Sequence, residues 1–313
     1  MTMVMDSAPF LVLVNPSSGG GLAGELAPYL VRELNRRDIP TLARKSERPG
    51  DITAEVQRRR GEIAGIVAVG GDGTMREVLA AAPPAELPIT MLPAGTANVL
   101  AAELKLPKRP ELCAKMIAAG HSRCFDVGSY RCADQPQAAP FLLFVGAGPD
   151  ARVVSDVHSR RKGGTLGKLR YAMPIAREIF GYEAQQHWIV LEDGRREGPF
   201  EQVLVSNVAA YGGFWQLPGK VRMDDGLLDV FGFRIRNGLA LLSQGIRGAL
   251  SKLGSQQDLQ HYQVVRVRIE SEAAAPIQAD GDPGGSCPVD IEVQDRQIRL
   301  FLPADSPLLS PEE

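Results

Sequence analysis

The sequence lacks the cysteine and histidine patterns that build metal centres. None of its four cysteines forms a CxxC pair, and none of its four histidines forms an HxxxH pair. Structural zinc sites depend on such closely spaced ligands, so we expect no zinc site. Cysteines without a disulfide framework are typical of a reducing compartment, and we expect reduced thiols in a cytoplasmic protein.

Long apolar runs are also missing. No apolar stretch approaches the roughly 18 residues that a membrane-spanning helix needs. The opening MTMVMDSAPF has neither a basic segment nor a long apolar segment. We therefore expect neither a membrane span nor a signal peptide.

The chain has no excess of positive charge and no P-loop. Lys and Arg total 35 against 37 Asp and Glu, so the net charge of −2 gives no reason to expect a nucleic acid partner. The pattern GxxxxGK[ST] is absent. Gly19, Gly21 and Gly24 satisfy GxGxxG, but Asn15-Pro16-Ser17-Ser18 separates them from the preceding apolar run. That insertion does not suit the tight turn of a dinucleotide-binding fold.

The most informative segment is residues 63–74, IAGIVAVGGDGT. A β-branched run leads into Gly70-Gly71-Asp72-Gly73-Thr74, and an apolar 3.6-residue period follows at once. A strand, a glycine turn and a helix start place backbone N–H groups where they can hold phosphate. Thr74 and Glu77, three residues apart, predict a capping box at the start of this helix.

The order of patterns predicts two domains of different class. Strand and helix patterns alternate up to about residue 125, which predicts a doubly wound α/β nucleotide-binding domain. From residue 126 to 290, short β-type runs separated by turn residues predict a mainly antiparallel β-sandwich domain.

Several ordered motifs together carry a family resemblance. They are Asn15-Pro16-Ser17-Ser18-Gly19, GGDGT, Pro93-Ala94-Gly95-Thr96-Ala97-Asn98, Ser206-Asn207, Tyr211-Gly212-Gly213, Asp224 to Val230 and Asp280-Gly281-Asp282. With this set, the chain resembles the diacylglycerol kinase and sphingosine kinase catalytic family, most of all the soluble bacterial lipid kinases. The resemblance implies that residues 126–290 hold the lipid substrate and a metal, and that the C-terminal segment, about 291–313, packs back on the first domain.

The same resemblance implies that ATP and Mg²⁺ are used and indicates which residues contact the nucleotide. They are Asn15, Pro16, Ser17, Ser18, Gly19, Ser46, Gly70, Gly71, Asp72, Gly73, Thr74, Met75, Arg76, Glu77, Thr96 and Asn98. Asp72 points to more than a structural turn, because a carboxylate beside phosphates is repulsive unless a cation or a hydrogen-bond partner compensates it. Asn98 is expected to brace the GGDGT loop. Many relatives have an aspartate next, whereas this chain has Val99.

A second acidic segment, Asp224 to Asp229, predicts a turn and also a hard-cation site, because carboxylate and carbonyl oxygens suit magnesium. Similar proteins hold a structural magnesium with one such aspartate and two backbone carbonyls. Carried over, these are Asp225 and the carbonyls of Arg222 and Leu227, with Asp126 as a neighbour.

The third acidic segment, Asp280-Gly281-Asp282, is where the resemblance places the general base. Relatives usually show Asp-Gly-Glu, so the last acid is one methylene shorter here. A base must lie within hydrogen-bond reach of the substrate hydroxyl. Asp280 and Asp282 both qualify, and we favour Asp280 as the proton acceptor.

The remaining features concern the membrane. A basic stretch runs from Ala151 to Phe180, and Phe214-Trp215 follows two glycines. The first is either a solvated helix face or a patch for anionic headgroups. The second either packs in the core or lines an acyl-chain cleft. The enzyme would meet its lipid peripherally and transiently at the inner membrane surface, and a homodimer fits the resemblance.

Three functions stay open on sequence alone. The first is an ATP-dependent lipid kinase acting on a diacylglycerol-like, sphingoid or ceramide hydroxyl. The second is a kinase with a soluble acceptor, such as an NAD kinase, which shares GGDGT. The third is a nucleotide- or lipid-binding regulator without catalysis, suggested by Asp282 and Val99 at positions where relatives differ.

Overall fold

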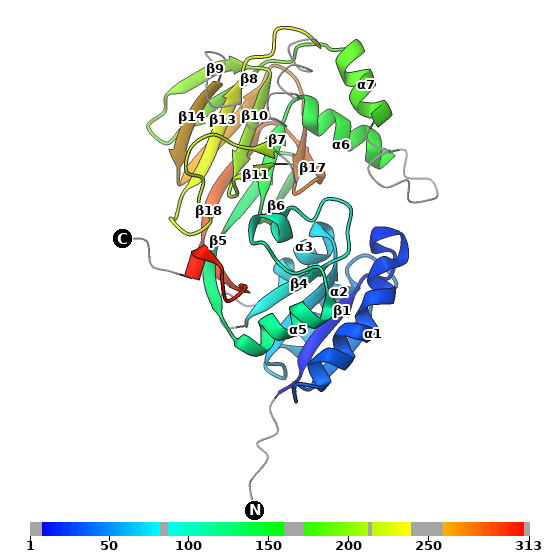
Figure 1. Ribbon diagram of the computed structural model, residues 1–313. Coiled ribbons are helices and arrows are strands. Elements are labelled where there is room, and N and C mark those ends of the chain that lie inside the picture. Colours follow the sequence, from blue (N-terminus) through cyan, green and yellow to red (C-terminus); the bar gives the residue numbers. More distant parts are fainter. Residues whose placement is uncertain (1–7, 82–86, 160–171, 212–214, 239–258, 310–313) are drawn as a thin grey trace, which may run out of the picture. The chain divides into compact units, whose positions relative to one another are not determined.

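The computed structural model describes residues 8–81, 87–159, 172–211, 215–238 and 259–309 (Figure 1). The chain forms two compact units. One contains residues 1–125 and 296–313, and the other contains residues 126–295. The chain passes between the units twice, within two long strands, β5 (Ser122–Cys132) and β18 (Val289–Phe301).

The first unit is built on a parallel sheet with the order β2-β1-β3-β4, and the end of β18 adds to it through Leu300 beside Ile89 of β4. Its elements are β1 (Phe10–Val14), η1 (Ser18–Gly21), α1 (Leu22–Asn35), β2 (Thr41–Lys45), α2 (Asp51–Arg59), β3 (Gly65–Gly70), α3 (Asp72–Ala81), β4 (Ile89–Pro93), α4 (Val99–Glu103), α5 (Pro110–Ala119) and η4 (Pro307–Leu309).

Two inner strands of this parallel sheet are fully buried. Strands β3 and β4 are buried at every position, as expected where helices cover both faces of a parallel sheet. Helix α1 packs beside α5, and α2 packs beside α3. Right-handed crossovers place α1 on one face and α2 and α3 on the other. The predicted doubly wound α/β fold is confirmed.

Among the described residues, the second unit contains two large antiparallel sheets and the short antiparallel pair β11-β12. One has the order β14-β13-β10-β7-β16-β17. The other continues from β18 through β15 and β8 to β9, and β5 pairs with β18 while β6 pairs with β5. Its remaining elements are β6 (Gln135–Phe141), β7 (Phe144–Ala147), α6 (Pro149–Ser159), α7 (Ala172–Phe180), β8 (His187–Leu191), β9 (Arg196–Phe200), β10 (Gln202–Ser206), β11 (Ala210–Tyr211), β12 (Trp215–Gln216), β13 (Leu228–Phe233), β14 (Leu259–Val264), β15 (Arg266–Ser271), β16 (Pro276–Ala279) and β17 (Asp282–Ser286).

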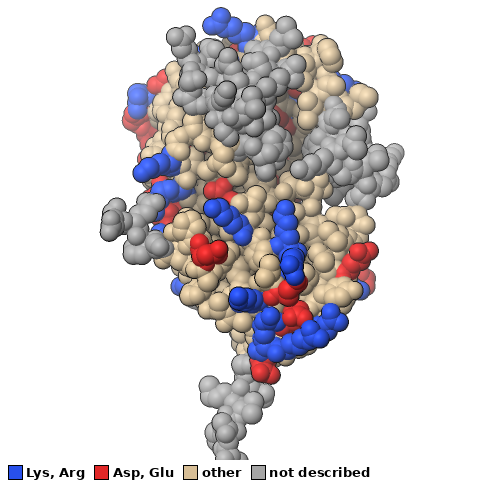
Figure 2. Space-filling view, in the orientation of Figure 1, with Lys and Arg blue, Asp and Glu red and all other residues tan. Residues whose placement is uncertain are grey.

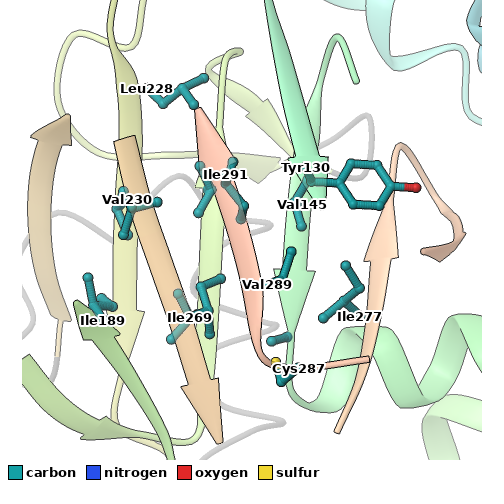
Figure 3. Close-up of a cluster of buried hydrophobic side chains, with 14 of the residues drawn as sticks. Tyr130, Val145, Ile189, Leu228, Val230, Ile269, Ile277, Cys287, Val289 and Ile291 are labelled. Carbon is teal, nitrogen blue, oxygen red and sulfur yellow. The ribbon is translucent and has the colours of Figure 1, made fainter. Parts of the chain in front are cut away.

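The core of this unit lies between its two sheets. Figure 3 shows Val145, Val230 and Ile277 from one sheet facing Ile269 and Ile291 from the other. Alternating apolar positions on both inner faces are what a sandwich requires. The predicted antiparallel β-rich second half is therefore confirmed, and its short strands follow the turn spacing of the sequence.

Two surface features bear on the possible partners. On the face drawn in Figure 2, Lys and Arg side chains lie among Asp and Glu side chains and do not form one positive field. None of the helices in the described part of the chain has both the length and the apolar character needed to span a membrane.

Candidate active site

The predicted nucleotide residues follow the carboxyl ends of neighbouring parallel strands in the first unit. Strand β1 lies between β2 and β3, so the chain leaves β1 toward one side and β3 toward the other. Open α/β sheets bind ligands at such a switch point, outside the carboxyl ends of the strands. The Asn15–Gly19 segment and the GGDGT loop flank this point, and Ser46 and Thr96 follow the adjacent strands.

Backbone hydrogen bonds join these loops beyond the strand ends. The Asn15 N–H donates to the Val69 carbonyl at 3.1 Å, and the Ala94 N–H donates to the Gly70 carbonyl at 2.8 Å. The Ser46 N–H donates to the Val14 carbonyl at 2.9 Å. The sheet ladder therefore continues into the loops and fixes their backbones relative to one another.

Glycines allow the loops to touch. Gly19 has φ of +61°, and a Cβ there would lie 1.9 Å from the Ala94 carbonyl oxygen. A Cβ on Gly95 would lie 2.5 Å from the Gly71 Cα. No side chain could be accommodated at Gly19 or Gly95, because the neighbouring backbone lies too close. The loops after β1, β3 and β4 thus form one interlocked backbone surface at the switch point.

Asp72 connects the GGDGT loop to the following motif. Its carboxylate accepts the N–H groups of Val99 at 3.1 Å and Leu100 at 3.2 Å. Burial raises the pKa of Asp72, and these two hydrogen bonds oppose that rise. The aspartate therefore holds the start of α4, where an anion is also stabilised by the helix N-terminus.

Asn98 organises the neighbouring turn. Its Oδ1 accepts the Gly95 N–H at 2.8 Å, and its Nδ2 donates to the Gly95 carbonyl at 2.9 Å. Gly95 in turn lies against Gly71. Asn98 therefore shapes the turn against which GGDGT packs.

In the second unit, Asp280 is held by a row of backbone donors. Its Oδ2 accepts the Leu142 N–H at 2.9 Å, and its Oδ1 accepts the Leu143 and Phe144 N–H groups at 2.9 and 3.0 Å. The residue is 7% exposed and has φ of 49°. The carboxylate orientation is thereby fixed. Asp282 begins β17, is half-buried and pairs with Ala279 across the turn.

The segment between β12 and β13 gathers further carboxylates. The Asp126 N–H donates to the Met223 carbonyl at 2.6 Å, and the Asp126 Oδ2 accepts the Gly226 N–H at 2.7 Å. Asp225 Oδ1 accepts the Leu227 N–H at 3.1 Å. Nearby, the fully buried Asp229 contacts His261 Nε2 at 2.6 Å, while its Oδ2 has no hydrogen-bond partner among the described residues.

Comparison with known proteins identifies what carries these sites. Residues 9–130 match the diacylglycerol kinase catalytic domain, and residues 144–302 match the YegS C-terminal NAD kinase beta sandwich-like domain. The chain belongs to the diacylglycerol kinase family of bacterial lipid kinases. It is thus an enzyme of the lipid kinase type.

Named relatives agree with this assignment. A probable lipid kinase YegS-like of Chromohalobacter salexigens is 30% identical, covering 71% of this chain and 70% of its own. A diacylglycerol kinase of Bacillus subtilis is 24% identical, covering 94% and 96%. The solved structure of a putative diacylglycerol kinase from Bacillus anthracis shares the fold, with a TM-score of 0.75, 23% identity and coverage of 96% and 98%.

One expectation for the family's glycine loop is wrong. Helix α3 begins at Asp72, and the Thr74 and Met75 N–H groups donate to the Gly71 carbonyl, so Thr74 lies inside the helix. Its hydroxyl is buried against Gly70 and makes no hydrogen bond with the described residues. Glu77 accepts the Gly50 N–H at 3.1 Å. The two side chains therefore do not form a capping box.

Other predicted nucleotide residues differ in what they present. The Met75 side chain is 2% exposed and belongs to the core, so only its backbone faces the loop. The Ser17 hydroxyl and the Ser17 N–H both donate to Asn15 Oδ1, at 2.8 and 3.3 Å. These two side chains therefore stabilise the turn in which they lie. Sequence reasoning missed Gly95 as a site residue, although its place between an alanine and a threonine after a strand was a usable signal.

Some predicted features lie outside the described residues. They are Gly212, Gly213, Phe214 and the basic residues between 160 and 171. Of the basic stretch, the structure describes α6 and α7. Met173 and Phe180 on α7 are 63% and 90% exposed, which is unusual for side chains of this size.

The predicted magnesium residue Asp225 lies among other carboxylates. Burial raises the pKa of Asp225, and the carboxylates of Asp229 and Asp126 raise it further. Negative charge that accumulates in this way is relieved by a bound cation. Among the described residues, no three Asp, Glu, His or Cys side chains converge as a metal centre. A cation here would thus depend on Asp225 and carbonyl oxygens, a donor set that fits Mg²⁺.

Removing the Asp225 carboxylate is expected to abolish a stabilising effect of Mg²⁺. At pH 7.5, Mg²⁺ should raise the melting temperature of the wild type by a few degrees, as binding to the folded state alone does. Because the pKa of Asp225 is raised, protons compete with Mg²⁺ for its carboxylate at a higher pH than usual. The Mg²⁺ effect should therefore weaken as the pH falls toward 5. Asp225→Asn should show no effect at either pH.

Differential scanning fluorimetry with and without Mg²⁺ measures this effect. Asp193→Asn is the matched control, because Asp193 lies in the exposed turn between β8 and β9 and should leave the Mg²⁺ effect intact. Equal Mg²⁺ effects in wild type and Asp225→Asn would show that the cation binds elsewhere.

Proposed function

We propose that the protein transfers the γ-phosphate of ATP to a hydroxyl of a membrane lipid, with a diacylglycerol-like alcohol as the first choice of acceptor. The interlocked glycine loops at the switch point of the first unit carry the proposal, because they provide a rigid backbone cradle for phosphates in a chain of the lipid kinase family. Sphingoid and ceramide hydroxyls have the same chemistry and form the second choice.

The first unit would hold ATP by its backbone. Phosphates would lie at the N-terminus of α3, where the backbone N–H groups of the first turn and the helix dipole favour negative charge. Asn15 to Gly19, Ser46, Gly70 to Glu77, Thr96 and Asn98 are proposed as the nucleotide contacts, with Met75 contributing only its backbone. Asp72 keeps these loops in place through α4 and does not need to contact phosphate.

The second unit would prepare the acceptor. The lipid oxygen bonds to the γ-phosphorus, the bond from that phosphorus to the bridging oxygen of the β-phosphate breaks, and ADP leaves. We propose that Asp280 takes the hydroxyl proton, because three backbone donors hold its carboxylate in one orientation, and that Asp282 supports it. Mg²⁺, when bound, would neutralise phosphate charge or steady the Asp225 segment. Phosphoryl transfer depends mainly on such positioning and charge stabilisation.

The acceptor would be met at a membrane surface on the cytoplasmic side. The exposed Met173 and Phe180 on α7 support contact with lipid, since single large apolar side chains insert readily at a bilayer interface. The contact is proposed to be peripheral and transient.

A comparison of acceptors tests the function. The purified protein, ATP with labelled γ-phosphate and Mg²⁺ would be mixed with vesicles of phosphatidylglycerol containing diacylglycerol, and in parallel with NAD. We expect labelled phosphatidic acid and no labelled NADP. Labelled NADP alone would favour the soluble-acceptor alternative, which the resemblance of the second domain to the NAD kinase sandwich keeps in view. Protein that never sediments with these vesicles would contradict the membrane contact.

A further inference from the structure

A buried glutamine connects the Asp280-Gly281-Asp282 turn to another part of the second unit. Gln278, in β16, is 1% exposed. Its Oε1 accepts the Gly281 N–H at 3.0 Å, and its Nε2 donates to Asp150 Oδ2 at 3.1 Å. One amide therefore joins the middle residue of the acidic turn to a carboxylate at the start of α6.

Asp150 is surrounded by donors. Its Oδ2 also accepts the Tyr211 hydroxyl at 2.8 Å, and its Oδ1 accepts the Ala151 N–H at 2.7 Å. The residue lies in the first turn of α6, where the helix dipole favours a negative charge. Burial raises the pKa of Asp150, while its hydrogen bonds, including those with Gln202, Tyr211 and Gln278, oppose the rise.

The backbone leaves room for this pair of side chains. Gly146, in the adjacent strand β7, faces them, and a Cβ there would lie 2.2 Å from Asp150 Oδ2 and 2.8 Å from Gln278 Nε2. Burying a carboxylate and an amide is costly compared with apolar side chains of the same volume. A fully hydrogen-bonded group of this kind is better explained by the conformation that it specifies than by stability.

The conformation in question is unusual. Asp280 and Gly281 are consecutive residues with positive φ, 49° and 81°. A left-handed residue other than glycine is strained and persists only where its surroundings hold it. The Asp280 carboxylate is held by the N–H groups of residues 142–144. Gln278 holds the next residue, so the turn is fixed at both of its left-handed positions.

We propose that Gln278 and Asp150 are positioning residues that keep the Asp280-Gly281-Asp282 turn in its left-handed conformation and thereby aim its carboxylates at the lipid hydroxyl. The inference rests on the proposed function of this turn. Neither residue is proposed to touch the reacting atoms. Tyr211 supports them by donating to the same carboxylate oxygen.

Two substitutions that move the negative charge from Asp150 to position 278 test whether these residues position the turn. Gln278→Glu keeps an acceptor for the Gly281 N–H but sets a carboxylate against Asp150. We expect kcat at pH 8 to fall about thirtyfold with the KM for ATP unchanged, and to recover as the pH falls, because two adjacent carboxylates then share a proton.

The double variant Asp150→Asn/Gln278→Glu restores a donor–acceptor pair with one carboxylate. Its kcat at pH 8 should return to within about threefold of the wild type. The recovery of activity at lower pH that is expected for Gln278→Glu should be absent from the double variant, as expected for residues that act as a unit. A role limited to folding would change the melting temperature and leave kcat per folded protein and its pH profile unchanged.

Hydrogen exchange of the Gly281 amide gives a readout that does not depend on activity. Gln278→Leu in the full-length chain should speed this exchange more than tenfold, because the amide loses its acceptor. Unchanged exchange would overturn the connection, and faster exchange with wild-type kcat would overturn its positioning role. A wild type without lipid kinase activity would contradict the proposed function, while the exchange would still decide the connection.

Discussion

Asp280→Asn is expected to lower kcat for lipid phosphorylation about a thousandfold, within the range of 10²–10⁴ that a positioned general base contributes. The amide cannot take the proton. It also sets an NH₂ group against at least one of the N–H donors of Leu142, Leu143 and Phe144, and an unsatisfied buried donor costs about 1–3 kcal/mol. Steady-state kinetics and the melting temperature should be measured together.

Asp282→Asn is the matched control for this prediction. It removes a carboxylate from the same turn without disturbing those three donors, and we expect kcat to fall by less than about tenfold. ATP binding should be unchanged in both variants, because the nucleotide residues lie in the other unit. The reverse pattern, with Asp282→Asn inactive and Asp280→Asn active, would make Asp282 the proton acceptor.

Gly95→Ala is expected to reduce kcat/KM for ATP about a hundredfold, the size of loss that a displacement of roughly 1 Å in a positioned site can cause. The new methyl group would lie 2.5 Å from the Gly71 Cα and 2.8 Å from Asn98 Oδ1. Since the Gly71 Cα is a backbone atom that cannot rotate away, the GGDGT loop itself must shift. Titration with ATP and steady-state kinetics measure the effect.

Two further glycines make a graded series with Gly95. A methyl group at Gly71 would lie 3.0 Å from the Gly95 Cα, so Gly71→Ala should show an intermediate loss. At Gly24, in α1, the nearest atoms belong to Pro16 at 3.8 Å, and Gly24→Ala should keep full activity with slightly higher stability. Wild-type ATP kinetics in Gly95→Ala would place the nucleotide away from the interlocked loops.

The sequence predicted the architecture of the first unit because the relevant signals are local. An apolar run such as residues 63–69 and a following helical period specify a strand and a helix, and the structure places them at Gly65–Gly70 and Asp72–Ala81. The capping box failed because several residues of GGDGT could begin the helix. The true partner of Glu77 is Gly50, and no local pattern indicates a contact 27 residues away.

For the second unit, the sequence predicted the short strands but not the hydrogen bonds between residues far apart in the chain. The donors to Asp280 lie 136 to 138 residues earlier in the chain, and only the pairing of β7 with β16 brings them together. Gln278 and Asp150 were missed for the same reason. The usable signal was a glutamine inside an apolar strand, since a buried polar side chain needs a partner.

We propose that this chain phosphorylates a lipid alcohol through its Asp280-Gly281-Asp282 turn. The most direct measurement is transfer of labelled γ-phosphate from ATP, with Mg²⁺, to a mixed lipid extract in detergent micelles, run for the wild type beside Asp280→Asn. We expect one new labelled lipid that the variant fails to make while it still binds ATP. No labelled lipid from a wild type that binds ATP, or equal labelling by both proteins, would contradict it.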